Sequence, residues 1–218
     1  RGDVMQTKET MMSVNPFAIT LDVGTSLANR TGSWRTLKPV YVDRLPPCNA
    51  KCPAGEQCQA WLFHAQSGNY ENAWKQIIED NPFPAVMGRV CYHTCQGACN
   101  RNGSDEPVGI NAVERCLGDF ALVKGWQLPV PAADTGKRIL IVGAGPAGLS
   151  AAYQLRRLGH AVHVVESAEA AGGMMRYGIP KYRLPREVLD QEIARIAALG
   201  VEFEFGRDVK VLNDEMKS

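Results

Sequence analysis

The sequence predicts a protein of the α plus α/β type, in which a helical, cysteine-bearing domain precedes the first part of a parallel α/β domain. All seven cysteines of the 218-residue chain lie between Cys48 and Cys116, among helical patterns. A glycine-rich turn at 143–148 follows an apolar run and opens a helical pattern, as in βαβ units. Pro129 and Pro131 separate the two regions, because proline does not fit inside a helix.

The composition excludes several functional classes. The apolar share of 45% and the charged share of 22% are those of an ordinary globular protein. A net charge of +1 gives no reason to expect a nucleic acid or an acidic membrane surface as a partner. The chain has no apolar run of about eighteen residues and no apolar segment near its start, so we expect neither a membrane span nor a secretory signal. We therefore expect a cytoplasmic protein.

Residues 1–46 are expected to form an arm. They are mixed and polar, and no helical or strand period is sustained there. Such an arm is either disordered or laid over a neighbouring surface, and Trp34, Val40 and Tyr41 favour partial docking.

Residues 47–126 are predicted to be helices joined by cysteine-bearing loops. A short helix should run from Gln57 to about Ser67, and a second should cover about 70–79, with an inner face of Ala73, Trp74, Ile77 and Ile78. The segment 91–99 should be a tight loop. A third helix should begin near 108–110 and carry Ala112, Val113, Leu117, Phe120 and Ala121. We interpret the aromatic residues of these helices, including Phe63 and Phe120, as core.

Residues 127–137 are expected to be a linker, and residues 138–218 a partial Rossmann-like domain. Strands and helices should alternate, beginning with a strand at Arg138–Val142. The following elements should be a helix from Pro146 to Leu158, a strand at 161–166, a helix at 186–199 and a strand at 201–205.

The glycine turn has the full context of a dinucleotide-binding site. Gly143 permits the tight turn, Gly145 lets a pyrophosphate approach the backbone, and Gly148 lets the helix pack on the strand. The helix that opens at Pro146-Ala147 offers free N–H groups to the phosphates. Glu166 ends the second strand, where a carboxylate favours a free ribose 2′-hydroxyl, hence FAD or NAD over NADP.

A second glycine loop, Gly172-Gly173-Met174, follows, and Arg183 lies shortly after it. With this loop the chain resembles the FAD-binding half of the glutamate synthase small (beta) subunit and the flavoprotein part of dihydropyrimidine dehydrogenase. In that family the second loop lies against the flavin end of FAD. The resemblance therefore implies FAD, held by the two glycine loops, Glu166, Met174 and Arg183.

The cysteine spacing points to a metal centre. Cys48 and Cys52 form a Cys-x3-Cys-Pro run, and Cys91, Cys95 and Cys99 are also four residues apart. An odd number of cysteines cannot pair fully within the chain, and such clusters in a cytosolic protein are more often metal ligands than disulfides. Structural zinc sites use Cys-x2-Cys runs, which are missing here, so the spacing favours a 4Fe–4S cluster over zinc.

The resemblance extends over about residues 40–205 and bears on the ligands. The family's first run has four cysteines, and Val40 and Asp43 occupy the first two positions here. One cluster of the two-cluster relatives takes ligands that correspond to Cys52, Cys91, Cys95 and Glu114. That set is intact. A second cluster would keep only Cys48 and Cys99, with Cys58, Cys116 or Asp43 as substitutes, although Cys58 and Cys116 could equally be buried helix thiols.

The resemblance implies an oxidoreductase in which electrons pass between FAD and one or two 4Fe–4S clusters and a catalytic partner subunit. Fuller members of the family carry an inserted NAD(P)-binding domain, so NAD(P)H would bind in a region that this sequence does not include. Because the cofactors supply the chemistry, we predict no catalytic side chain. Two alternatives stay open, a subunit of a 2-oxoacid oxidoreductase complex and a non-enzymatic, zinc-stabilised assembly module.

Overall fold

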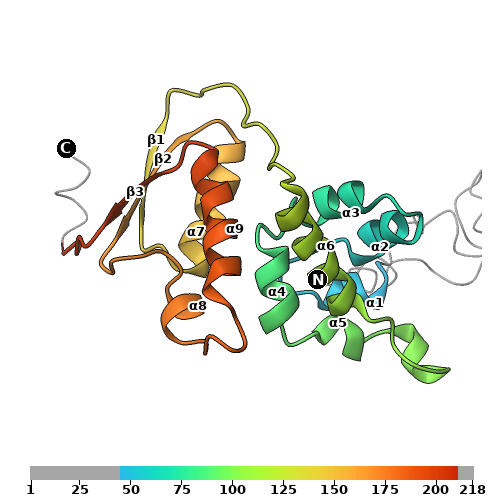
Figure 1. The fold of residues 1–218 in the computed structure, drawn as a ribbon. Helices are drawn as coiled ribbons and strands as arrows, with labels where there is room; N and C mark the ends of the chain where they lie inside the picture. The colour runs from blue at the N-terminus through green and yellow to red at the C-terminus, as the bar shows by residue number, and fades with distance from the viewer. Residues whose placement is uncertain (1–44, 211–218) are drawn as a thin grey trace, which may run out of the picture. The chain divides into compact units, whose positions relative to one another are not determined.

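A helical region leads into a parallel β-sheet in a computed structural model, which describes residues 45–210 (Figure 1). The arm expected at 1–46, with Val40 and Asp43, lies almost wholly outside the described residues. Within the described part of the chain, no helix is both long enough and apolar enough to cross a membrane.

The helical region contains the three predicted helices and several short ones. The predicted helices are α2 (Cys58–Gln66), α3 (Tyr70–Ile77) and α6 (Ile110–Lys124). The unpredicted elements are α1 (Pro47–Lys51), α4 (Pro84–Val90), α5 (Thr94–Gly97) and the 3₁₀ turn η5 (Asn100–Gly103). The tight loop expected at 91–99 therefore contains a helical turn. Elements this short show no sustained periodicity, which is why the pattern did not indicate them.

Helices α4 and α6 cross in close contact because each carries a glycine at the crossing. A Cβ atom on Gly88 would lie 2.4 Å from the Cα of Arg115, and one on Gly118 would lie 2.3 Å from the backbone nitrogen of Ala85. Arg89 of α4 then makes a two-pronged contact with Asp119 of α6, at 2.7 and 3.0 Å. This crossing therefore sets the position of Glu114, on α6, relative to the C-terminal end of α4.

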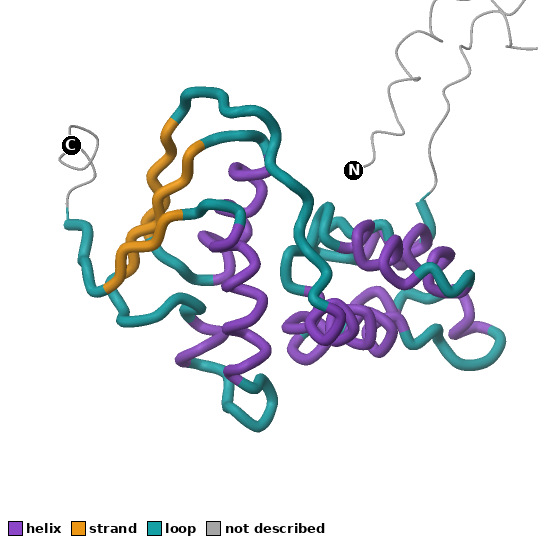
Figure 2. The backbone as a smooth tube through the Cα atoms, turned by 45° about the horizontal axis from the view of Figure 1, so that its top comes forward, coloured by secondary structure: helices purple, strands orange, loops and turns teal. Residues whose placement is uncertain are grey.

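The sheet has the predicted elements within one or two residues. Strands β1 (Arg138–Val142), β2 (Ala161–Glu166) and β3 (Glu202–Phe205) are parallel and lie in the order β1-β2-β3. Helices α7 (Pro146–Arg157) and α9 (Arg186–Ala198) cover one face, as Figures 1 and 2 show, and the short α8 (Met174–Tyr177) precedes α9. The predicted fold class, a helical domain followed by the start of a Rossmann-like sheet, is confirmed.

One apolar core is shared by the helical region and the sheet region. Trp74, Ile78 and Val86 belong to the same buried cluster as Leu149, Leu189 and Ile196. The hydroxyl of Tyr153 on α7 donates a 2.7 Å hydrogen bond to the carbonyl of Ile78. Leu128, inside the expected linker, is also buried in this cluster. The domain boundaries at 126 and 138 remain predictions, and they divide residues that fold around a common core.

The interpretation of Phe63 and Phe120 as core residues is wrong. Phe63 is 64% exposed and Phe120 is 39% exposed, and both line an apolar groove that also contains Tyr70, Cys48 and Cys116. An amphipathic pattern shows which side of a helix is apolar, but it does not show whether another element covers that side.

Candidate functional site

The thiols of Cys52, Cys58 and Cys95 lie together in the helical region. The Sγ atoms of Cys52 and Cys58 and a carboxylate oxygen of Glu56 all lie within 4.8 Å of one another. Cys58, at the start of α2, is also in hydrogen-bonding contact with Cys95 of α5. Helices α1 and α5 are held side by side, because the Thr94 hydroxyl donates a 2.8 Å hydrogen bond to the carbonyl of Lys51.

Cys91 joins this group from the end of α4. Its backbone N–H donates to the carbonyl of Met87 at 3.0 Å, which continues the helical pattern to the cysteine. The backbone N–H of His93 lies 3.4 Å from the Cys91 sulfur, and His93 has a left-handed φ of 55° that turns the chain into α5. Burial raises the pKa of the Cys91 thiol, and the charges of Glu114, Cys95 and Cys52 act in the same direction.

Cys48, on α1, is near enough to Cys99 and Cys95 for the charges of both to act on it. Burial raises the pKa of the Cys48 thiol, and the charges of Cys99 and Cys95 add to the effect. Cys116 differs from the others, since it is exposed on α6, in the apolar groove. The structure thus brings together the five cysteines that the sequence singled out, adds Cys58 to them, and leaves Cys116 at the surface.

Two buried carboxylates border the thiols and share one amide. Asn81 donates from Nδ2 to Glu56 and to Glu114, at 2.9 Å each, while its Oδ1 accepts from the N–H of Phe83. Glu56 is 4% exposed and Glu114 is 6% exposed. Burial and the neighbouring Cys52 raise the pKa of Glu56 to about 7, and burial together with Glu56 holds the pKa of Glu114 well above its usual range.

This donor set fits a cationic centre. Within residues 45–210, neither Glu56 nor Glu114 has a salt-bridge partner. Buried carboxylates and thiolates are costly unless a cation or protons neutralise them. Sequence reasoning missed Glu56. The one feature of the sequence that could have indicated it is that Glu56 follows Cys52 by four residues.

The glycine turn connects β1 to α7 with the geometry expected of a dinucleotide-binding turn. Gly143 has a φ of 99°, and a Cβ atom on Gly148 would lie 1.9 Å from the carbonyl oxygen of Gly143. Gly145 is different, because the nearest atom to a Cβ there would be the Cα of Gly173, 4.0 Å away. Gly148 is therefore required by packing inside the chain, whereas the space at Gly145 is open to a ligand.

Glu166 holds the turn in shape through backbone hydrogen bonds. Its Oε2 accepts from the N–H of Ala144 at 2.6 Å, and its Oε1 accepts from the N–H of Ala168 at 2.9 Å and the hydroxyl of Ser167 at 3.2 Å. Burial alone would raise the pKa of Glu166, but these hydrogen bonds outweigh it and lower the pKa. The carboxylate is thus ionised at neutral pH, and Oε2, which accepts one hydrogen bond, keeps a further lone pair for a ligand hydroxyl.

The second glycine loop touches the first. The N–H of Gly172 donates a 2.7 Å hydrogen bond to the carbonyl of Ala144. Gly173 has a φ of 47°, and a Cβ atom there would lie 2.7 Å from the Cα of Gly145. The remaining residues expected to bind the cofactor are exposed, and these are Pro146, Ala147, Met174 and Arg183.

Comparison with protein-family models matches both parts of the chain. Residues 43–126 match the model described as dihydropyrimidine dehydrogenase domain II, 4Fe-4S cluster. Residues 141–193 match the model described as an NAD(P)-binding Rossmann-like domain.

Similar proteins are found among bacterial redox enzymes. The chain is 37% identical over 187 residues to the NADP(+)-dependent formate dehydrogenase subunit beta of Moorella thermoacetica, covering 76% of this chain and 26% of that protein. It is 39% identical over 165 residues to an NAD-dependent dihydropyrimidine dehydrogenase subunit PreT homolog of Salmonella typhi, covering 75% and 40%. It is 37% identical over 171 residues to the NADPH glutamate synthase small chain of Bacillus subtilis, covering 76% and 34%.

The chain spans between 26% and 40% of the length of these three relatives. The first family model covers the cysteine group, and the second covers the glycine turns. Residues 43–126 are thus similar to a 4Fe-4S domain of dihydropyrimidine dehydrogenase and residues 141–193 to a Rossmann-like domain, and the chain as a whole resembles part of the glutamate synthase small chain and of dihydropyrimidine dehydrogenase subunits.

Proposed function

We propose that the chain is an electron-transfer segment of an NAD(P)H-linked oxidoreductase that contains FAD and iron–sulfur clusters. The observation that carries the proposal is the group of Cys52, Cys91 and Cys95, which lies against the buried carboxylate of Glu114. The adjoining pair of glycine loops is suited to binding a second redox cofactor. The chain would work with a catalytic partner subunit, and in the cytoplasm, where thiols are kept reduced.

Cys52, Cys91, Cys95 and Glu114 are the ligands that we propose for one 4Fe–4S cluster. Glu56 lies within 4.8 Å of the Cys52 sulfur and shares the amide of Asn81 with Glu114, which supports the placement of Cys52 and Glu114 around one centre. Cys48 and Cys99 would serve a second cluster. Because Cys58 contacts Cys52 and Cys95, we assign it as a neighbour of the first cluster rather than a ligand of the second.

FAD is the dinucleotide that we propose for the glycine turns. Its pyrophosphate would lie at the open backbone of Gly145, near the N-terminus of α7, and its ribose would meet the ionised Glu166. The loop at Gly172, Gly173 and Met174, with Arg183, would bound the flavin end. Bound FAD supplies the exchange between two-electron and one-electron steps, while the side chains of this chain bind it and orient it.

A zinc-stabilised assembly module is the competing function. The observation that favours it is the compactness of Cys52, Glu56 and Cys58, whose ligand atoms lie within 4.8 Å of one another. Ligands of a single tetrahedral ion are that close together, since each lies about 2.0–2.3 Å from zinc.

Metal and flavin analysis of the anaerobically purified protein separates the two functions. We expect about four or about eight iron atoms per chain with matching sulfide, according to whether one or two clusters form. A brown colour should bleach with dithionite. The variant Cys58→Ala should keep its iron, and Cys91→Ala should lose the iron of the first cluster. Zinc in a one-to-one ratio without sulfide would overturn the redox proposal.

A further inference from the structure

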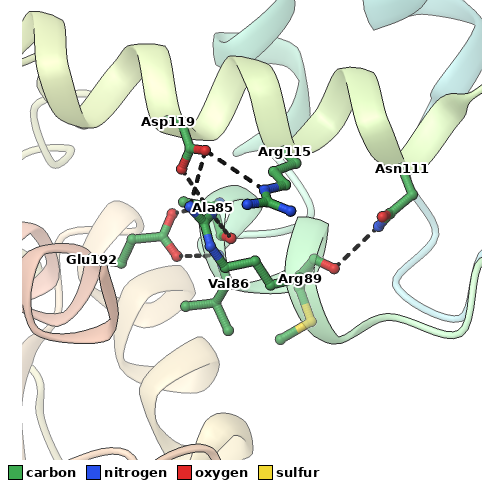
Figure 3. A network of polar contacts seen from close by, with 8 residues as sticks. Ala85, Val86, Arg89, Asn111, Arg115, Asp119 and Glu192 are labelled. Carbon is green, nitrogen blue, oxygen red and sulfur yellow. Dashed lines mark hydrogen bonds and ion pairs between the residues drawn. The ribbon is translucent and has the colours of Figure 1, made fainter. Parts of the chain in front are cut away.

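A buried carboxylate of the sheet region contacts the helical region at the start of α4. Glu192 of α9 is 1% exposed. Its Oε1 accepts a 2.9 Å hydrogen bond from the N–H of Ala85, and its Oε2 accepts a 3.0 Å hydrogen bond from the N–H of Val86 (Figure 3). Each oxygen of the carboxylate thus satisfies one backbone donor of another element.

These two donors have no partner within their own helix. The first N–H groups of any helix lack intrahelical acceptors. In α4 the first residue, Pro84, has no N–H, and Phe83 before it provides no side-chain cap. The cap of α4 therefore comes from a residue more than a hundred positions later in the chain.

The other end of α4 leads directly to the cluster ligand Cys91. The carbonyl of Met87 accepts hydrogen bonds from the N–H of Cys91 at 3.0 Å and from Nδ2 of Asn111 on α6 at 3.2 Å. Arg89 is held by Asp119, as Figure 3 shows. A short helix that is fixed at both ends transmits the position of its first turn to its last.

Helix α9 also contacts the second glycine loop. Leu189 lies three residues before Glu192, so the two side chains share one side of the helix. A Cβ atom on Gly172 would lie 3.0 Å from Cδ2 of Leu189. One helical turn of α9 therefore touches the loop assigned to the flavin end and, through Glu192, the helix that carries Cys91.

We propose that Glu192 is a positioning residue, which sets the place of Cys91, and so of its cluster, relative to the dinucleotide-binding loops. This inference rests on the proposed function for the identity of the two cofactors. The cap itself does not depend on that function. It is a property of the chain without cofactors.

The charges around Glu192 explain why a carboxylate is tolerated there. Burial raises the pKa of Glu192 to about 8, while the hydrogen bonds from Ala85 and Val86 and the positive charges of Arg195 and Arg89 oppose the rise. The charge of Glu192 also acts on Glu114 of α6. An apolar residue would avoid the desolvation cost, so the carboxylate serves the contact with α4 rather than stability alone.

The variant Glu192→Gln tests the inference, because glutamine has the same size but only one acceptor oxygen. Its NH₂ group would face one of the two backbone donors. Above about pH 8, where the carboxyl of Glu192 is ionised and both of its oxygens accept, we expect amide hydrogen exchange at Ala85 or Val86 to become at least about tenfold faster, as for one lost hydrogen bond. In the iron-loaded protein, we expect a shifted EPR spectrum and midpoint potential at unchanged iron content. Glu187→Gln, on the exposed side of α9, is the matched control and should change none of these.

The outcomes are separable. Exchange at wild-type rates in Glu192→Gln would overturn the cap, and faster exchange with an unchanged EPR spectrum and potential would overturn the positioning role. If the wild-type protein binds no iron–sulfur cluster, the proposed function and the positioning of a cluster both fail, and the exchange experiment still decides on the cap. Should the glutamine variant not fold, Glu192→Met removes both acceptors without adding a donor and carries the same expectations.

Discussion

The cysteine-bearing region and the glycine-turn region build their sites in different ways. The glycine turn satisfies its own polar groups, since the N–H of Ala144 is bound by Glu166 and its carbonyl by Gly172. The cysteine region leaves Glu56 and Glu114 buried around a single amide, beside the thiols of Cys52, Cys91 and Cys95. We therefore expect the glycine turn to keep its shape without a ligand, and we expect the cysteine region to gain stability from a bound cation.

The largest expected effect is therefore the loss of the metal centre. In the variant Cys52→Ala, we expect most of the iron of the first cluster to be lost. The free energy of unfolding should fall by roughly 3 kcal/mol or more, because buried acids remain without compensation. Iron analysis and thermal unfolding measure both effects. The control Cys116→Ala removes an exposed thiol and should retain both iron and stability. Equal losses of iron and of stability in Cys52→Ala and Cys116→Ala would contradict the expectation that the buried cysteine group holds the metal.

Two glycine variants should separate the effect on protein stability from the effect on flavin binding in the glycine-turn region. Gly148→Ala places a Cβ atom 1.9 Å from the carbonyl oxygen of Gly143, so we expect a loss of about 2–3 kcal/mol of stability and of flavin binding. Gly145→Ala meets nothing closer than 4.0 Å, so it should keep its stability and lose affinity for the pyrophosphate alone. Denaturant unfolding and flavin titration test the pair, and a Gly145→Ala variant that binds flavin normally would exclude the proposed site.

Glu192 should make the contact between the two regions depend on pH. Its pKa is raised from 4.5 to about 8 in the folded protein, so the folded state holds a proton that the unfolded state releases between these values. The contribution of Glu192 to stability is therefore fully present below about pH 4.5 and is lost as the pH rises towards 8.

The comparison of wild type with Glu192→Gln isolates this contribution, since other acids titrate equally in both. We expect the stability of the wild type to fall relative to the variant by roughly 3 kcal/mol between pH 5 and pH 8. Urea unfolding at several pH values measures it. Parallel pH profiles for the two proteins would show that Glu192 does not titrate in this range.

The smallest expected effect concerns the contacts that hold α4 on α6. Arg89→Lys removes the two-pronged contact with Asp119, which lysine cannot reproduce, and should cost about 1 kcal/mol. Arg101→Lys alters an exposed pair with Asp105 and should leave the unfolding midpoint unchanged. If the two variants unfold alike, side-chain contacts of α4 are no more important than those at the surface.

Local patterns explain how much of the fold could be predicted. The strand at Arg138–Val142, the turn and the helix from Pro146 form within a short window, where periodicity and glycine spacing act together. Helix α4 could not be predicted in this way. Its cap is Glu192 and its glycine at the crossing is Gly88, and both depend on elements that lie far away in the sequence.

The sequence by itself determined the residue types of both sites: thiols at metal-ligand spacing, and glycines where backbone must approach backbone or ligand. Only the tertiary structure decided that Cys58 and Glu56 join the cysteine group, that Cys116 stays outside it, and that the two regions share a core. The physical reason is the range of the interactions. A turn is set by dihedral angles and neighbouring hydrogen bonds, whereas burial and charge depend on every element that packs nearby.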